Sequence, residues 1–144
     1  MIKKTNRLTA VEESAIRDLL TLSKKVDGLV REPYLSNQLN ADLTMPAFIL
    51  FMEDGILLGF LAIYADDVYE PEISLLVHPE HRHKGIARAL LDTYKEIAQA
   101  YQLGQPTFVI EKRFLKAYPT LLENFGLKVV ADDSEFFMER GRTP

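Results

Sequence analysis

The apolar positions in the first third of the chain follow the pattern of amphipathic helices. Thr9 precedes Glu12 by three residues, the spacing of a capping box, in which each side chain bonds the backbone N–H group of the other residue. Apolar residues then recur on one helical face, so the sequence predicts a first helix over 10–23. A second, shorter helix is expected within 24–36, where a glycine and a proline interrupt the pattern.

The next part of the chain has the pattern of β-strands. Runs of apolar, β-branched and aromatic residues at 47–52 and 56–64 are separated by a turn that contains Asp54 and Gly55. An Asp-Gly pair between two such runs is typical of a β-hairpin. Residues 72–77, which lie between two prolines, predict a third strand whose apolar end is in the middle of a sheet.

Helical spacing returns in the second half of the chain. Residues 85–103 place apolar side chains on a shared face and predict the clearest helix of the sequence. The elements expected after it are a strand over 107–110, a helix over 114–124 and two strands over 127–130 and 135–138. Because helices and strands alternate without a linker, repeat or low-complexity segment, the sequence predicts one α/β domain over residues 1–144.

Composition narrows the class of protein. Of the 144 residues, 47% are hydrophobic and 26% are charged, as in ordinary soluble globular proteins. The apolar runs are far shorter than the roughly 20 residues that cross a bilayer, and no apolar stretch follows the basic N-terminus. We therefore expect a cytoplasmic protein that does not bind membranes.

Cysteine content and charge exclude some chemistry. The chain has no cysteine, which rules out disulfides, thiolate metal ligands and an acyl-cysteine intermediate. Its formal net charge of −4 argues against a nucleic-acid partner. Four acidic residues, Asp66, Asp67, Glu70 and Glu72, crowd one predicted loop and would attract a cationic amine, although a solvated loop also explains them.

One segment in the middle of the chain carries the candidate chemistry. It is a strand, then a tight basic turn, then a helix that opens at Gly85. The first N–H groups of a helix have no intrahelical partners and lie at the positive end of its dipole, so they can converge on a phosphate. Gly85 and the small Ala87 would let the backbone approach such a group, and Arg82, Lys84 and Arg88 add positive charge. A basic surface turn is the alternative.

This segment resembles a family signature. The sequence Arg82-His83-Lys84-Gly85-Ile86-Ala87 is similar to the Gln/Arg-x-x-Gly-x-Gly/Ala signature of the Gcn5-related N-acetyltransferases. The flanks are similar too, because Val77-His78-Pro79 precedes the signature and Leu90-Leu91 follows it. The resemblance covers residues 45–130.

The resemblance implies a fold, a cosubstrate and a mode of binding. The family has a single-domain acyl-CoA N-acyltransferase fold, with a mixed, mostly antiparallel sheet of six to seven strands flanked by about four helices. Acetyl-CoA is the implied cosubstrate. Backbone N–H groups from His83 to Ala87 would hold its pyrophosphate, and backbone groups of Leu75, Leu76 and Val77 would pair with its pantetheine arm like an added strand.

Acetyl transfer to an amine needs a base, an oxyanion donor and a proton for the leaving thiolate. By the resemblance, Glu72 is the candidate general base, acting through water; the alternative is a strand end in solvent. Many family members have a tyrosine four residues before the glycine that corresponds to Gly126, but this chain has Leu122 there. Tyr118, one helical turn earlier, is the candidate general acid, although its apolar neighbours also suit a core tyrosine.

Three histidines, His78, His81 and His83, lie within six residues and raise the question of a metal site. Their spacing is not that of a helical pair of ligands and no metallohydrolase carboxylate accompanies them, so we expect no metal. No serine has the context of a nucleophile elbow. The sequence therefore predicts direct transfer, in a ternary complex, from acetyl-CoA to a primary amine of a small molecule or peptide. A catalytically silent acyl-CoA binding or sensing module is the alternative, and a homodimer is compatible with both.

Overall fold

The computed structural model describes residues 1–27, 35–82, 84–111, 127–133 and 136–141. Along the chain they form β1 (Ile2–Thr5), α1 (Ala10–Asp27), β2 (Phe48–Glu53), β3 (Ile56–Tyr64), β4 (Glu72–Val77), the 3-10 helix η1 (Pro79–His81), α2 (Ile86–Ala100), β5 (Thr107–Glu111), β6 (Leu127–Asp133) and β7 (Phe136–Gly141). This alternation of helices and strands confirms the expected α/β class.

The strands form one seven-stranded sheet with the order β1-β2-β3-β4-β5-β7-β6. Every neighbouring pair is antiparallel except β4 and β5, which are parallel. β3 is buried over residues 57–63, as expected for a strand that is covered on both faces. The sheet is thus mixed, and its single parallel pair, β4 and β5, is formed by the fourth and fifth strands of this order.

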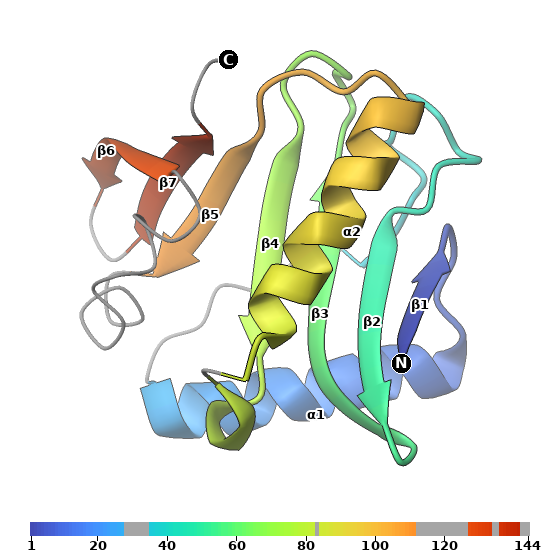
Figure 1. The fold of residues 1–144 in the computed structure, drawn as a ribbon, viewed down its shortest axis with the longest axis vertical. Helices are drawn as coiled ribbons and strands as arrows, with labels where there is room; N and C mark the ends of the chain where they lie inside the picture. Colours follow the sequence, from blue (N-terminus) through green and yellow to red (C-terminus); the bar gives the residue numbers. More distant parts are fainter. Residues whose placement is uncertain (28–34, 83, 112–126, 134–135, 142–144) are drawn as a thin grey trace.

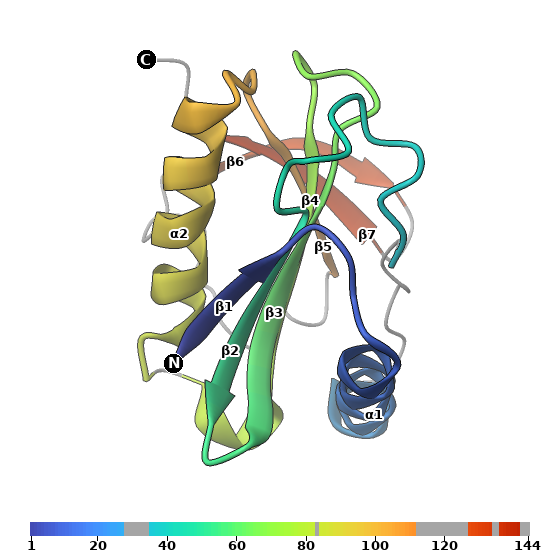
Figure 2. The same cartoon turned by 90° about the vertical axis from the view of Figure 1, so that its right-hand side faces the viewer.

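The two described α-helices lie on opposite faces of the sheet. Figure 1 shows α2 in front of the strands, and the turned view in Figure 2 shows α1 on the far side. Apolar side chains from α1, α2, β2, β3 and β4 form most of the core between these layers. Its largest fully buried members include Phe48, Phe60, Ile16, Met45, Ile63 and Leu90.

Part of the predicted helix content lies outside the described residues. The helix expected over 114–124 is in that part of the chain, so the number of about four helices stays a prediction. No helix in the described ranges is both long enough and apolar enough to cross a membrane.

Some boundaries differ from those that the sequence predicts. α1 continues to Asp27, so it takes up the first residues of the second helix expected within 24–36, and the described residues at the end of that range are not helical. The sequence pattern also misses β1. This strand has only four residues, and two of them are Lys3 and Lys4, so it lacks the apolar run by which a strand is recognised.

The two turn and cap signals of the sequence are confirmed. Asp54 and Gly55 both have positive φ angles, 52° and 77°, as the two central residues of a type I′ hairpin turn require. In the capping box, the N–H group of Thr9 donates to Oε1 of Glu12 at 2.9 Å, and the N–H group of Glu12 donates to Oγ1 of Thr9 at 3.1 Å. Lys3 Nζ lies 2.6 Å from the second carboxylate oxygen of Glu12, which ties β1 to the start of α1.

The ion pair between Lys3 and Glu12 predicts a pH-dependent contribution to stability. Burial acts to raise the pKa of Glu12, but the hydrogen bonds and charge of Lys3 and the Thr9 backbone outweigh it and lower this pKa. The pKa of a glutamate in the unfolded chain is about 4.3. A carboxylate with a lower pKa in the folded state stabilises the protein fully above that pH, and this stabilisation is lost as the pH falls through the folded-state pKa.

We therefore expect Glu12→Gln to lower the free energy of unfolding at neutral pH by up to about 1 kcal/mol, because glutamine keeps the cap but loses the ion pair. Denaturant titrations of both proteins measure the difference. It should shrink toward zero as the pH is lowered below about 4, where the carboxylate of the wild type takes up its proton. A difference that does not change with pH would show that the ion pair has no part in it.

Candidate functional site

The N-terminus of α2 has no capping side chain. Gly85 is the N-cap residue, and the first intrahelical bond runs from the N–H group of Ala89 to the carbonyl of Gly85 at 3.0 Å. The N–H groups of Ile86 and Ala87 come before that bond, so the helix offers them no acceptor. These groups and the positive end of the helix dipole face outward at the start of α2.

Gly85 is required here by its backbone conformation. It has φ 83° and ψ 6°, in the left-handed region that side chains disfavour. A Cβ atom at this position would have no heavy atom within 4 Å. The space in front of the helix is therefore open, and the glycine both shapes the turn and leaves room for a group that approaches the backbone.

The basic turn before α2 is ordered by two contacts to the main chain. Nδ1 of His78 accepts a hydrogen bond from the N–H group of Glu80 at 3.1 Å and so caps η1. Arg82 Nε donates to the carbonyl of Val77 at 3.3 Å. Burial and the nearby charges of His81 and Arg82 lower the pKa of His78, which keeps its ring neutral and able to accept.

Two of the three histidines of this turn lie in the described part of the chain. The rings of His78 and His81 meet edge to face, with centroids 4.9 Å apart, and His83 lies outside the described residues. In the part of the chain that the structure describes, no group of three histidine, aspartate or glutamate side chains could hold a metal ion.

A second glycine sets the position of α2 on the sheet. Gly59 of β3 lies under the first turns of the helix, where an added Cβ atom would be 2.9 Å from Cγ2 of Ile86 and 3.1 Å from the carbonyl oxygen of Leu76. The helix can lie this close to the strand only because no side chain intervenes. Gly59 is the direct partner of Val77, so its contact with Ile86 brings the start of α2 to the end of β4.

β4 loses its parallel partner before it ends. The ladder between β4 and β5 joins residues 72–74 to 107–109, and β5 then continues along β7 to Glu111. Figure 1 shows β4 and β5 diverging toward the N-terminus of α2. Among the described strands, residues 75–77 of β4 therefore pair only with β3.

The backbone groups on the open edge of β4 come from alternate residues. The N–H group of His78 donates to the carbonyl of Leu58 in β3 at 2.7 Å. By the alternation of an antiparallel ladder, Leu76 also turns its backbone groups toward β3, whereas Leu75 and Val77 turn theirs toward the open edge. The sequence alone does not distinguish these three residues.

Glu72 lies at the other end of β4, on the opposite face from α2. It pairs with Tyr64 and Thr107 and is half-buried. Side chains alternate along a strand, and Val77 shares the face of Gly59, so the side chain of Glu72 lies on the face covered by α1. Tyr118, the other candidate catalytic residue, is outside the described part of the chain.

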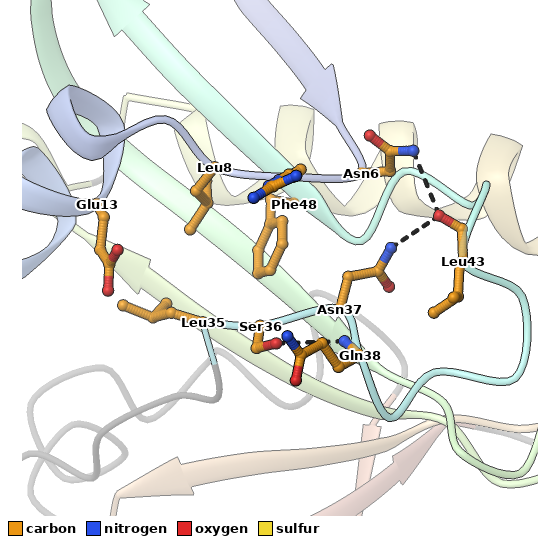
Figure 3. Close-up of a pocket in the computed structure, with 10 residues that line it drawn as sticks. Asn6, Leu8, Glu13, Leu35, Ser36, Asn37, Gln38, Leu43 and Phe48 are labelled. Carbon is orange, nitrogen blue, oxygen red and sulfur yellow. Dashed lines mark hydrogen bonds between the residues drawn. The ribbon is translucent and has the colours of Figure 1, made fainter.

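A cavity of about 530 Å³ opens on this same face. Figure 3 shows Phe48 and Leu8 at its apolar wall, with Glu13 of α1 at one end. Phe48 pairs with Ala62, which pairs with Ser74, so the cavity and Glu72 belong to one face of the sheet.

The polar wall of the cavity is a loop held by asparagine side chains, a feature without a signal in the sequence. Oδ1 of the buried Asn40 accepts from the N–H group of Ala65 at 2.7 Å, and its Nδ2 donates to Asn37 at 2.6 Å. Asn37 and Asn6 both donate to the carbonyl of Leu43, at 2.9 and 3.3 Å (Figure 3). The loop is thereby fixed to the end of β3.

The uncapped helix, the glycine in front of it and the open strand edge are features that could hold an extended ligand with a phosphate group. A sequence model of the acetyltransferase (GNAT) family matches residues 14–113, more than half of the chain. The chain therefore belongs to the acetyltransferase (GNAT) family, as the signature at 82–87 indicates.

Solved structures share the fold. PaiA N-acetyltransferase from Thermoplasma acidophilum, in complex with coenzyme A, has a TM-score of 0.74 at 19% identity, covering 99% of this chain and 98% of that chain. An acetyltransferase from Streptococcus agalactiae also gives 0.74, at 14% identity with the same coverage. YncA from Salmonella typhimurium, with acetyl-CoA, gives 0.67 at 17% identity, covering 97% of this chain and 91% of that chain. No curated protein sequence matches the chain significantly.

Proposed function

We propose that the protein is an N-acetyltransferase that moves the acetyl group of acetyl-CoA directly to a primary amine of a small molecule or peptide. The observation that carries this proposal is the uncapped N-terminus of α2 beside a strand whose outer edge is open. Membership of the family supports it, as does the fold shared with PaiA and YncA, whose structures contain coenzyme A and acetyl-CoA.

In this proposal the pyrophosphate of acetyl-CoA lies in front of Gly85. Backbone N–H groups from His83 to Ala87 donate to its oxygens, and the dipole of α2 favours its negative charge. The left-handed conformation of Gly85 and the open space around it let the phosphate approach the backbone. Arg82 and Lys84 precede the glycine and add two positive charges.

The pantetheine arm then runs along the open edge of β4. Leu75 and Val77, which turn their backbone groups to this edge, pair with the amide groups of the arm like an added strand. The backbone groups of Leu76 face β3, so Leu76 forms no backbone hydrogen bond with the arm. At about 3.3 Å per residue, the open edge carries the arm ~7 Å from Val77 to Leu75, in the direction of Glu72.

The acetyl group reacts near Glu72 in this arrangement. The carboxylate of Glu72 takes a proton from the ammonium group of the acceptor through a water molecule. The amine nitrogen attacks the thioester carbonyl, a C–N bond forms and the C–S bond breaks. We assign to Tyr118 the proton that the leaving thiolate takes up. Because the chain has no cysteine, the acetyl group passes directly between the two substrates in a ternary complex.

The acceptor enters from the α1 face, which the cavity shares with Glu72. The cavity combines an apolar wall with amide groups and with one residue of each charge, Arg7 and Glu13. The acidic loop at 66–70 also lies just before β4 and attracts a cationic amine. These features support an acceptor that has both a protonated amine and a neutral polar or apolar body.

A catalytically silent acyl-CoA binding or sensing module is the second candidate. The observation that favours it is Leu122, which stands where many family members have a tyrosine. This candidate shares the coenzyme site with the first and differs only in turnover. It predicts that the protein binds acetyl-CoA and acetylates no amine.

The coenzyme site is tested by two variants of Gly85 that differ in charge alone. Asparagine and aspartate both tolerate the left-handed conformation and have the same shape, but aspartate places a negative charge before the N–H groups. We expect Gly85→Asp to bind acetyl-CoA at least tenfold more weakly than Gly85→Asn, about 1.4 kcal/mol in binding free energy. Calorimetric titration measures both, with thermal melts as the control for folding. Equal affinities of the two variants would show that no phosphate group binds in front of Gly85.

The role of Glu72 is tested by turnover. We expect Glu72→Gln to lower kcat by roughly 10²- to 10⁴-fold, because it removes the base, and to leave acetyl-CoA affinity unchanged. Glu96→Gln, at an exposed position of α2 to which no role in binding is assigned, is the matched control and should keep full activity. A thiol-release assay over polyamines, aminoglycosides, amino acids and peptides measures turnover, and Tyr118→Phe is assayed in the same way. If the wild type binds acetyl-CoA but no amine is acetylated, the silent module is correct.

A further inference from the structure

A buried tyrosine on α2 has a hydroxyl group without a partner. Tyr94 is only 4% exposed, and its hydroxyl forms no hydrogen bond among the described residues. Tyr101, the C-cap residue at the end of the same helix, donates to the carbonyl of Thr44 at 3.4 Å. A buried hydroxyl without a partner is destabilising, so a group that supplies one is favoured at this position.

The protonation state of Tyr94 makes it a steady donor. Burial raises the pKa of Tyr94 above the ordinary value for a tyrosine. The hydroxyl therefore stays protonated at every pH at which the protein would work, and it can donate to a carbonyl or accept from an amide.

The hydroxyl is carried by the helix that begins at Gly85. Ala87, Leu91 and Tyr94 follow one another at i, i+4 and i+7, so they lie along one stripe of α2, and Leu91 and Tyr94 are both buried. At 1.5 Å per residue, Tyr94 is about 10 Å along the helix from Ala87.

The stripe faces the side of the helix where β4 lies. Ile86 and Leu90 sit directly over Gly59 in β3. In Figure 1, α2 runs upward in front of the sheet with β4 and β5 to its left. Successive residues of a right-handed helix are rotated by about 100° about its axis. In this view, the residue that follows one facing the sheet is therefore rotated to the left. The stripe that starts at Ala87, the residue after Ile86, thus faces β4.

We propose that the Tyr94 hydroxyl is a binding group for the pantetheine arm of the coenzyme, hydrogen-bonded to one of the arm's amide or hydroxyl groups. This inference rests on the proposed function. An arm that starts at Gly85 and follows the open edge of β4 toward Glu72 runs in the same direction as the stripe. Leu75 and Val77 contact it from the strand, and Tyr94 contacts it from the helix.

The test is Tyr94→Phe, with Tyr101→Phe as a matched control that removes the same atom from the same helix region. We expect Tyr94→Phe to raise the Kd for coenzyme A and the KM for acetyl-CoA about tenfold, with kcat unchanged. Its Kd for 3′-phosphoadenosine 5′-diphosphate, which has the pyrophosphate but no pantetheine arm, should equal that of the wild type. The melting temperature without ligand should not fall, because no bond is lost in the free protein.

Tyr101→Phe should do the reverse: it should lower the melting temperature slightly and leave both affinities unchanged. The inference is overturned if Tyr94→Phe leaves coenzyme A affinity intact, weakens both ligands equally, lowers kcat alone, or destabilises the free protein more than Tyr101→Phe does. Failure of the proposed function looks different, since the wild type itself would then bind neither ligand.

Discussion

The proposed site depends on one electrostatic feature, a helix N-terminus whose first N–H groups have no acceptor within the helix and no capping side chain among the described residues. Most helices satisfy these groups with a serine, threonine, aspartate or asparagine at the N-cap. α1 does so with Thr9, but α2 begins at a glycine that has no side chain to offer. In the proposed function, the N–H groups of Ile86 and Ala87 and the dipole of α2 bind the pyrophosphate of the coenzyme.

The sheet holds this helix end where it can act on an extended ligand. Gly59 lets α2 lie directly against β3, and its pairing with Val77 puts the start of the helix at the end of β4. β4 is not paired with β5 after Ser74, so its edge at residues 75–77 is open, and this edge ends near the start of α2. Backbone donors at the helix and backbone groups at the strand edge are thereby adjacent, although the seven residues 78–84 separate Val77 from Gly85 in sequence.

Local signals in the sequence predicted most of the described elements. The capping box at Thr9, the turn at Asp54 and the glycine at Gly85 each act through neighbouring residues, and the structure has the expected conformation at all three. β1 was missed because its place in the sheet comes from pairing with β2, which a four-residue strand with two lysines does not signal.

The features of the site that the sequence did not reveal are set by long-range contacts. The cavity depends on Asn40 reaching a backbone group at Ala65, 25 residues away. Which residues of β4 face the open edge depends on the register with β3, and the unpaired hydroxyl of Tyr94 depends on how α2 packs. A residue type and its spacing do not specify any of these contacts.

Amide NMR observes the N–H groups at the start of α2 directly. In a titration of ¹⁵N-labelled protein with coenzyme A, we expect the amide signals of Ile86 and Ala87 to shift downfield until the site is saturated. The amide signals of Asp54 and Gly55 in the hairpin turn should not shift. Saturable binding that leaves the signals of Ile86 and Ala87 unmoved would contradict the proposed site.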